Sequence, residues 1–425
     1  MADVRPFRAL RYSPQINLPD VVCPPFDVIS PEQQHTLHDR DPHNAVRIEL
    51  AIPNGGDRYQ AAAATLDSWR GENAVAVDQS PAYYLYDQTY THSGKSLTRR
   101  MLFARVRLEP WSAGVVLPHE QTFGAPKEDR LQLLRAINLQ ASPIFMIYRD
   151  RASTINAVLA RAAQTEPAVS FTSDDGQSHT LRLISDAESL EALRAAFEGE
   201  TLYIADGHHR YETLLGFRDE VRANSSDWTS DEPANFAMAA LAAAADPGML
   251  VLPIHRITAN GDPWPVVSGR LSAGFRIERL DSLATLNGAL VRAEGHAWGL
   301  VARDHPTPML LTVADPAAVD ALLPQDRSPA WRALDYSIAN HAIMRHGLGL
   351  TDDQMTNYSS VWFAEDAAAA ERDVRTGLAQ YAVILNPIPV NTVLDLATEG
   401  ERMPQKSTFF YPKVPTGLLF NSLDV

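Results

Sequence analysis

The stretch YIADGHHRYETLLGF, residues 203–217, places an aspartate, two histidines and an arginine in five consecutive positions between an apolar run and an amphipathic run. Asp206 is a plausible N-cap, which predicts a helix beginning directly after an apolar strand. The backbone N–H groups in the first turn of such a helix have no intrahelical acceptors, so they form an anion site together with the helix dipole. Gly207 leaves room for a phosphate, and Arg210 offers a planar fork to phosphate oxygens. We therefore predict phosphate binding at residues 206–210.

The two imidazoles of this stretch admit more than one role. His208 and His209 can donate hydrogen bonds to a phosphate, and His209 is also a candidate to move a proton. Adjacent histidines do not share one helix face, so a zinc site is disfavoured. Asp206 at the end of a strand could instead hold a divalent metal between phosphates. The alternative to all of these roles is a capped helix with surface histidines.

A second group of polar residues occurs in PHEQTFGAPKEDR, residues 118–130. A carboxylate beside an imidazole suits general-base chemistry, which makes Glu120 and His119 candidate catalytic residues. Positive charge at the start of the helix expected here suits an anion. The candidate phosphate ligands in this stretch are Thr122, Lys127 and Arg130. The alternative is an ordinary charged loop and a solvated helix face, and HExT is not the HExxH of metalloproteases.

Three further stretches combine a rigid proline with an acid, a base or a hydroxyl: PPFDVIS at 24–30, PIHR at 253–256 and MPQKSTFFYPK at 403–413. Each is more often a turn or a sheet edge than a site. The prolines of the last stretch confine it to edge strands or an irregular loop. Its Lys406 and Lys413 leave two interpretations open, a return to the phosphate site or a brace for the sheet.

Strands and helices alternate around these motifs. Aromatic alternation on both sides of Ser93-Gly94 predicts a β-hairpin. Pro126 suits the first turn of a helix, PIFMIY at 143–148 predicts a buried strand, and WRALDYSIANHAIM at 331–344 predicts a single helix. The fold class expected is α+β, with a mixed sheet flanked by helices in a larger multi-lobed chain.

The lobes expected lie within one unit that spans 1–425. A phosphate-binding core is predicted at about 110–260, a helical or mixed lobe at about 260–345, and C-terminal strands that close on the core at 346–425.

Composition narrows the function classes. The net charge of −15 argues against nucleic acid as a partner, because phosphate backbones favour basic surfaces. A single cysteine, Cys23, fits a reducing compartment. The amino-terminal residues lack the apolar region of a signal peptide, and the most apolar stretch is interrupted too early for a membrane span. We expect a cytoplasmic protein that binds small molecules, and the motifs of common nucleotide-binding and hydrolase folds do not occur.

Several motifs in order resemble a widespread bacterial family long catalogued as a domain of unknown function. They extend from Arg5 to about Asn421 and are RPFRALRY, PPFDVIS, LPHEQT, PKEDR, ADGHHRYET and MPQKSTFFYPK followed by TGL.

The DGHHR segment also resembles the phosphate-binding signature of the ParB/sulfiredoxin-like superfamily. That group includes a nucleotide-binding partition protein, an ATP-dependent sulfinic-acid reductase and free L-serine kinases. The resemblance implies a ParB/sulfiredoxin-like core of about 100–150 residues, with residues 206–210 on the donor phosphates. It also implies that Glu120 is the base on a substrate hydroxyl, since the kinases carry a catalytic glutamate upstream of the motif.

The leading hypothesis is a small-molecule phosphotransferase that phosphorylates free L-serine with ATP, ADP or pyrophosphate. Phosphoryl transfer needs positioning, charge compensation and usually Mg²⁺, which Asp206 would hold. One alternative is a phosphomonoesterase that hydrolyses a phosphoserine-like substrate at the same site. The other is a nucleotide-binding switch protein without catalysis. The residues leave donor, acceptor, metal and oligomeric state open.

Overall fold

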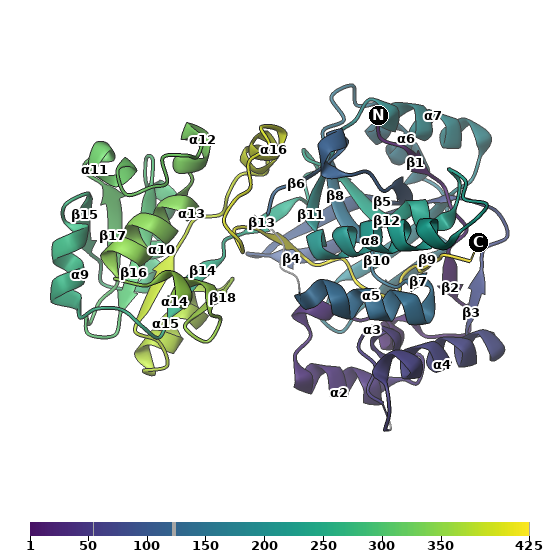
Figure 1. Cartoon of the computed structure of the whole chain (residues 1–425), viewed down its shortest axis with the longest axis horizontal. Helices are drawn as coiled ribbons and strands as arrows, with labels where there is room; N and C mark the ends of the chain where they lie inside the picture. Colours follow the sequence, from purple (N-terminus) through teal and green to yellow (C-terminus); the bar gives the residue numbers. More distant parts are fainter. Residues whose placement is uncertain (54, 121–124, 425) are drawn as a thin grey trace. The chain divides into compact units, whose positions relative to one another are not determined.

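A computed structural model describes residues 1–53, 55–120 and 125–424 and has an α+β fold, as expected (Figure 1). The chain divides into two compact units. Unit 1 comprises Met1–Pro118, Thr122–Leu250 and Pro412–Val425, and unit 2 comprises His119–Gln121 and Val251–Tyr411. The predicted core at 110–260 falls mostly in unit 1. The two lobes predicted at 260–345 and 346–425 are not separate, because both belong to unit 2 up to Tyr411, and the residues from Pro412 onwards belong to unit 1.

Unit 1 is built on a mixed nine-stranded sheet with the strand order β6-β11-β8-β12-β5-β4-β10-β9, and β1 also pairs with β5. The β11–β6 and β12–β8 pairs are parallel and the other pairs are antiparallel. The strands are β1 (Val4–Arg5), β4 (Tyr83–His92), β5 (Lys95–Arg107), β6 (Val116–Pro118), β8 (Ile144–Tyr148), β9 (Val169–Thr172), β10 (Ser178–Ile184), β11 (Leu202–Asp206) and β12 (Phe236–Ala243).

Smaller pairings complete the strands of unit 1. They join β2 (Leu10–Tyr12) to β3 (Val75–Val77) and β7 (Leu139–Gln140) to β21 (Asn421–Ser422). The second pairing anchors the C-terminal segment of the chain beside the end of an internal helix.

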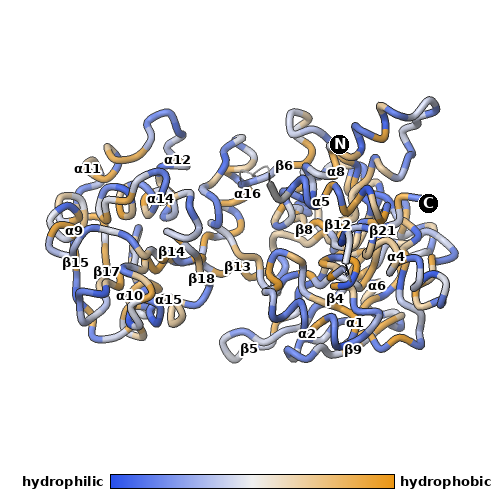
Figure 2. Tube along the Cα trace, turned by 60° about the horizontal axis from the view of Figure 1, so that its bottom comes forward, coloured by the Kyte–Doolittle hydropathy of each residue, from blue (hydrophilic) through white to orange (hydrophobic). Residues whose placement is uncertain are grey.

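Helices pack on this sheet because their apolar stripes face its buried strands, and Figure 2 shows hydrophobic segments concentrated around β4 and β12. Every residue of β12 is buried, which explains its uninterrupted apolar sequence. The helices of unit 1 are α1 (Leu18–Val21), α2 (Pro31–Arg40), α3 (Val46–Glu49), α4 (Arg58–Gly71), α5 (Ala125–Ile137), α6 (Thr154–Ala162), α7 (Ala187–Glu198) and α8 (His208–Asn224), with 3₁₀ turns η1 (Phe26–Val28), η2 (Trp111–Ala113) and η3 (Pro233–Asn235).

The β4–β5 hairpin turns at Ser93-Gly94, as predicted, because both residues adopt the left-handed conformation that such a turn requires. Gly248 packs against the backbone of β5. A Cβ at this glycine would lie 2.3 Å from the carbonyl of Thr98, and its own carbonyl accepts a hydrogen bond from the Tyr90 hydroxyl. This contact fixes the strand that carries Arg99.

Unit 2 contains an antiparallel six-stranded sheet in the order β15-β17-β16-β19-β14-β18. Its strands are β14 (His255–Thr258), β15 (Phe275–Arg279), β16 (Ala297–Ala302), β17 (Met309–Val313), β18 (Val361–Ala364) and β19 (Tyr381–Ile384), and the short strands β13 (Leu250–Leu252) and β20 (Phe409–Tyr411) lie outside it. Its helices are α9 (Trp264–Leu271), α10 (Leu283–Arg292), α11 (Pro316–Asp320), α14 (Asp352–Thr356), α15 (Ala367–Arg375) and α16 (Val390–Thr398).

The single helix predicted at 331–344 is wrong. The structure has two short helices, α12 (Pro329–Arg332) and α13 (Asp335–Ile338), followed by the π-helix η4 (Ala339–Gly347). The chain leaves the helical conformation at Leu334, where ψ is 132°. Tertiary packing therefore overrides the periodic apolar pattern at this point.

The Gly248 contact predicts a specific stability change. Gly248→Ala is expected to lower the free energy of unfolding by about 1–3 kcal/mol, because its Cβ meets backbone rather than a movable side chain. Urea denaturation followed by circular dichroism measures the change. Gly216→Ala is the matched control, since Gly216 lies in α8 with no neighbour within 4 Å and should gain about 0.5–1 kcal/mol. Equal stability of the two variants would contradict the close packing.

Candidate functional site

The DGHHR motif lies at the junction of β11 and α8, as the sequence predicts. The predicted N-cap is wrong by one residue, because Gly207 caps α8 with φ 96° and ψ 28° and no side-chain cap bond forms. A register shift between Ile204 and Asp206 interrupts the pairing of β11 with β8. The shift and the left-handed glycine turn the chain sharply from strand to helix, which leaves the carboxylate of Asp206 for other partners.

Asp206 is paired with two cations from different parts of unit 1. Its Oδ2 accepts a hydrogen bond from Arg210 Nη2 at 2.6 Å, and its Oδ1 is ion-paired with the ammonium of Lys413. The Asp206 side chain is only 16% exposed. Burial raises the pKa of this carboxyl, but Lys413 and Arg210 outweigh it and hold the pKa well below its ordinary value. Asp206 is therefore ionised in the folded protein.

A third cation, Arg99, is fully buried near this pair. Its positive charge interacts with the carboxylate of Asp206. The Arg99 guanidinium lies 4.7 Å from the ring centroid of Phe145, and Phe145 is the residue of β8 that pairs with Asp206 of β11. Arg99 donates to Gln88 and to the carbonyl of Pro412. Burial lowers the pKa of Arg99 to about 10, so it remains charged at neutral pH.

Gly207 lets Arg210 fold back over the turn. A Cβ at Gly207 would lie 3.1 Å from the guanidinium of Arg210. Arg210 also donates from Nη1 to the carbonyl of Pro143, so two acceptors fix its orientation. The guanidinium of Arg210 therefore lies close to the turn because residue 207 has no side chain.

The predicted anion ligands of α5 are engaged in ion pairs. Lys127 pairs with Glu212 of α8. The guanidinium of Arg130 contacts Asp129 at 2.6 Å and the buried Glu49 at 3.3 Å. These contacts join α5 to its neighbours, and phosphate binding by the two side chains stays a prediction. The predicted ligand Thr122 lies outside the described residues.

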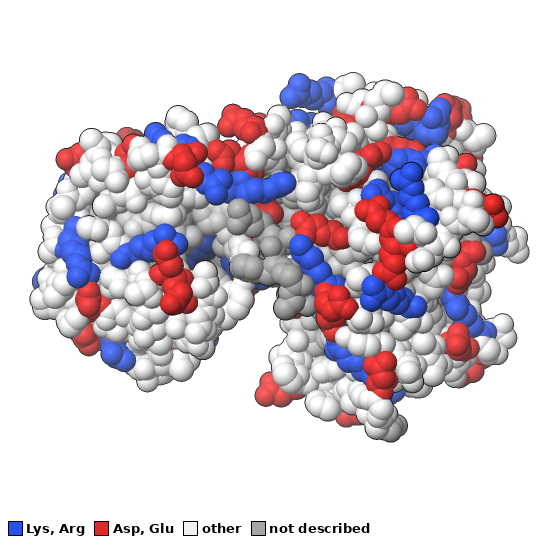
Figure 3. Space-filling view, in the orientation of Figure 1, with Lys and Arg blue, Asp and Glu red and all other residues white. Residues whose placement is uncertain are grey.

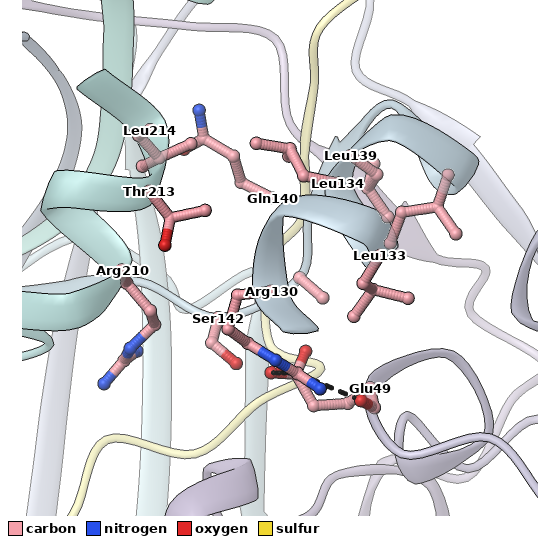
Figure 4. A pocket seen from close by; sticks show the side chains of 12 residues that line it. Glu49, Arg130, Leu133, Leu134, Leu139, Gln140, Ser142, Arg210, Thr213 and Leu214 are labelled. Atoms are coloured by element: carbon pink, nitrogen blue, oxygen red, sulfur yellow. Dashed lines mark hydrogen bonds and ion pairs between the residues drawn. The ribbon is translucent and has the colours of Figure 1, made fainter. Parts of the chain in front are cut away.

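Arg130 and Arg210 line one cavity of about 60 Å³ (Figure 4). Ser142 and Thr213 contribute hydroxyls to its lining, and leucines of α5 and α8 contribute aliphatic surface. Figure 4 shows Arg130 reaching towards Glu49 on one side of the cavity and Arg210 extending from α8 on the other. The lining of the cavity combines an apolar wall with the guanidinium groups of two arginines.

The predicted catalytic residues His119 and Glu120 belong to unit 2, whereas residues 206–210 belong to unit 1. His119 is buried and its Nε2 lies 2.9 Å from Thr408 Oγ1. Glu120 Oε1 accepts a hydrogen bond from the backbone N–H of Ser407 at 3.1 Å. Both side chains therefore contact the 403–413 motif. In unit 1, His208 is buried at the start of α8 and His209 is half-buried.

The arrangement does not fit the predicted metal role of Asp206. Each of its carboxylate oxygens already faces a cation, so a divalent ion would meet positive charge there. In the part of the chain that the structure describes, no group of three or more His, Cys, Asp or Glu side chains is placed to hold a metal ion.

Sequence reasoning did not include Lys413 and Arg99 among the site residues. Lys413 lies in a motif that the sequence analysis singled out, and its pairing with Asp206 shows that this end of the motif returns to the turn. Arg99 lies in β5, an ordinary alternating strand, and only its electrostatic interaction with Asp206 in the folded chain identifies it. On the face shown in Figure 3, by contrast, acidic and basic side chains are interspersed over the surface.

Comparisons with known proteins give one family match. A family model described as "Protein of unknown function (DUF1015)" matches residues 4–337. No curated protein matches the chain. Among the described residues, none of the helices combines the length and the hydrophobicity needed to cross a membrane.

Three solved structures align with low similarity. A conserved hypothetical protein from Pyrococcus furiosus has a TM-score of 0.36 and 15% identity, covering 76% of this chain and 96% of that chain. A free serine kinase in complex with AMP has a TM-score of 0.36 and 13% identity, covering 73% and 86%. SbnI with a C-terminal truncation from Staphylococcus aureus has a TM-score of 0.35 and 10% identity, covering 75% and 86%. Alignments at these TM-scores assign no role to any residue of this chain.

The ion pairs of Asp206 predict a large stability change. Asp206→Asn keeps the shape of the side chain but leaves Lys413 and Arg210 without this counter-charge. The free energy of unfolding is expected to fall by about 3–5 kcal/mol, measured by urea denaturation. Asp219→Asn is the control, because Asp219 is mostly exposed beside Arg218 and should cost less than about 1 kcal/mol.

The pH dependence of this difference follows from the lowered pKa of Asp206. A carboxyl whose pKa is lower in the folded than in the unfolded protein stabilises the fold at every pH above the unfolded-state pKa. This stabilisation is lost as the pH falls through the folded-state pKa. The difference between wild type and Asp206→Asn should therefore stay constant from about pH 8 to about pH 5. A variant as stable as the wild type at neutral pH would contradict the role of the ion pairs.

Proposed function

The chain belongs to the DUF1015 family, whose function is unknown, and we propose that it is a phosphotransferase that binds a phosphate-bearing donor at residues 206–210. The observation that carries the proposal is the convergence of Arg210, Lys413 and Arg99 on a glycine turn at the start of a helix. Positive side chains, a helix N-terminus and a close backbone approach together favour a phosphate.

Phosphoryl transfer suits this arrangement because it needs little covalent help from the protein. Charge on the equatorial oxygens must be compensated, and the donor must be held in line with the acceptor. Arg210 carries five N–H donors, of which Pro143 and Asp206 engage only some. Its remaining donors are available to phosphate oxygens, while Asp206 holds the guanidinium in place and acts as a positioning residue.

The acceptor in this proposal is a small molecule with a hydroxyl group. The cavity lined by Arg210, Ser142 and Thr213 presents two hydroxyl groups and a guanidinium that can form hydrogen bonds with such a molecule. As the oxygen of the acceptor attacks phosphorus, the bond to the donor breaks and the hydroxyl proton must pass to a base. His209 is our candidate for this base, because its half-buried imidazole lies in the first turn of α8.

The donor and acceptor to test first come from the resemblance of the DGHHR segment to free serine kinases. They are ATP, ADP or pyrophosphate as donor and L-serine as acceptor. Magnesium belongs in the assay as a variable, since the ion pairs of Asp206 do not leave its carboxylate to a metal.

The decisive experiment follows ³¹P NMR of purified protein with L-serine and each donor, with and without Mg²⁺. Wild type is expected to form phosphoserine from one donor. Arg210→Ala is expected to bind that donor about 10- to 100-fold more weakly and to lose turnover, because charge-assisted hydrogen bonds are removed. Arg222→Ala is the matched control, since Arg222 is an exposed arginine of the same helix and should behave like wild type.

Other outcomes distinguish the alternatives. Release of phosphate from phosphoserine without transfer would replace the kinase by a phosphomonoesterase. Donor binding that depends on Arg210 but gives no turnover would support a nucleotide-binding switch protein. Absence of both binding and turnover would contradict the proposed site.

A further inference from the structure

Lys406 occupies a backbone conformation that a lysine rarely adopts. Its φ is 55°, in the left-handed region. The other residues with positive φ in the described chain, glycine apart, are asparagine, serine or aspartate, whose short polar side chains tolerate this region. A glycine at position 406 would avoid the strain, so the chain retains a lysine there at a cost in stability.

The residues around Lys406 are held from one side by the His119–Glu120 segment. Glu120 Oε1 accepts a hydrogen bond from the N–H of Ser407, the residue directly after Lys406. The imidazole of His119 contacts Thr408 at 2.9 Å, and its carbonyl accepts a hydrogen bond from the N–H of Met403. The segment therefore fixes both ends of the strained loop 403–408.

Arg256 holds the same loop from another direction. This arginine is fully buried, and it donates to the carbonyls of Lys406 at 2.8 Å and Gln405 at 3.2 Å. Its guanidinium lies against the rings of Tyr336 and Phe363, which fix its plane. Burial lowers the pKa of Arg256 to about 10, so it stays charged while it bonds these carbonyls. Hydrogen bonds from buried groups thus stabilise the left-handed conformation at Lys406, which the backbone would not adopt by itself.

The side chain presented by this loop is an exposed ammonium. The side chain of Lys406 makes no hydrogen bond or ion pair with any residue that the structure describes. The chain contains only four lysines among 37 lysines and arginines: Lys95, Lys127, Lys406 and Lys413. A chain that almost always uses arginine has thus placed a compact, strongly hydrated point charge at a left-handed backbone position.

We propose that Lys406 is a binding residue for an oxyanion of a small-molecule ligand of unit 2, and that Glu120, His119 and Arg256 are positioning residues for its loop. The inference goes beyond the proposed function, because it places an anion contact in unit 2 and gives Glu120 a role other than the predicted base. The oxyanion is a phosphate group or the carboxylate of an amino acid. These two sources share the same chemistry, and the experiment separates them.

The scarcity of lysine allows a direct test. Reductive ¹³C-dimethylation of the intact protein labels four lysines and the amino terminus, and each variant of a lysine to arginine identifies one NMR signal. The signal lost in Lys406→Arg is titrated with inorganic phosphate, pyrophosphate, ATP and L-serine. A saturable shift is expected for this signal, and Lys95, which is exposed at the start of β5, serves as the internal control.

Each titration result has a defined meaning. A shift with inorganic phosphate, pyrophosphate or ATP identifies the oxyanion as a phosphate group, and a shift with L-serine alone identifies it as a carboxylate. No shift with any probe, or an equal shift of Lys95, overturns the inference. If a donor still binds in a manner that depends on Arg210, the proposed function survives that failure. A saturable Lys406 shift in a protein whose binding is insensitive to Arg210→Ala would instead preserve the inference and overturn the proposed site.

Three substitutions separate the charge of Lys406 from its strained backbone. Lys406→Ala keeps the strain and removes the charge, Lys406→Gly relieves the strain and removes the charge, and Lys406→Arg keeps both. We expect the alanine and glycine variants to bind the probe at least tenfold more weakly, while the glycine variant melts about 2 °C above the alanine variant. Unaltered binding by both uncharged variants would overturn the role of the ammonium. A glycine variant that melts no higher than the alanine variant would overturn the argument from strain.

Discussion

The pairing of Asp206 with Lys413 and Arg210 is the interaction on which the candidate site depends. A carboxylate that is only 16% exposed is costly to ionise unless cations compensate for its lost hydration. Lys413 lies 207 residues further along the chain, so this compensation ties the C-terminal segment to the β11–α8 turn. The backbone carbonyls of Pro412 and Lys413 accept hydrogen bonds from Arg99 and Gln88, which fixes the segment against the large sheet.

One stretch of eleven residues, 403–413, supplies a lysine to each compact unit, since the division falls between Tyr411 and Pro412. Lys413 is locked into a buried ion pair, whereas Lys406 is exposed on a loop that buried side chains hold in a strained form. Contacts with other segments hold the stretch near both lysines, for different physical reasons. At Lys413, burial strengthens the Coulomb attraction to Asp206. At Lys406, hydrogen bonds restrain the flanking backbone.

Local patterns predicted the local structure well. The hairpin at Ser93-Gly94, the strand at 143–148 and the helix after Pro126 are confirmed, because turn residues, apolar runs and helix-start residues act within a few positions. The prediction for 331–344 was wrong, since the same apolar spacing can be packed as two short helices and a π-helix. The N-cap prediction was wrong by one residue, because Asp206 satisfies distant cations instead of the first turn of α8.

The sequence by itself determined the strand-to-helix turn at residues 206–210, since an apolar run, a glycine and a helical stripe are neighbours along the chain. Only the tertiary structure decided which charges meet there. Lys413 and Arg99 arrive from distant segments, Lys127 and Arg130 engage acidic neighbours, and His119 and Glu120 bind the loop of Lys406 in the other unit. A charge acts through space, and its partners are set by how strands and helices pack, which spacing along one chain does not encode.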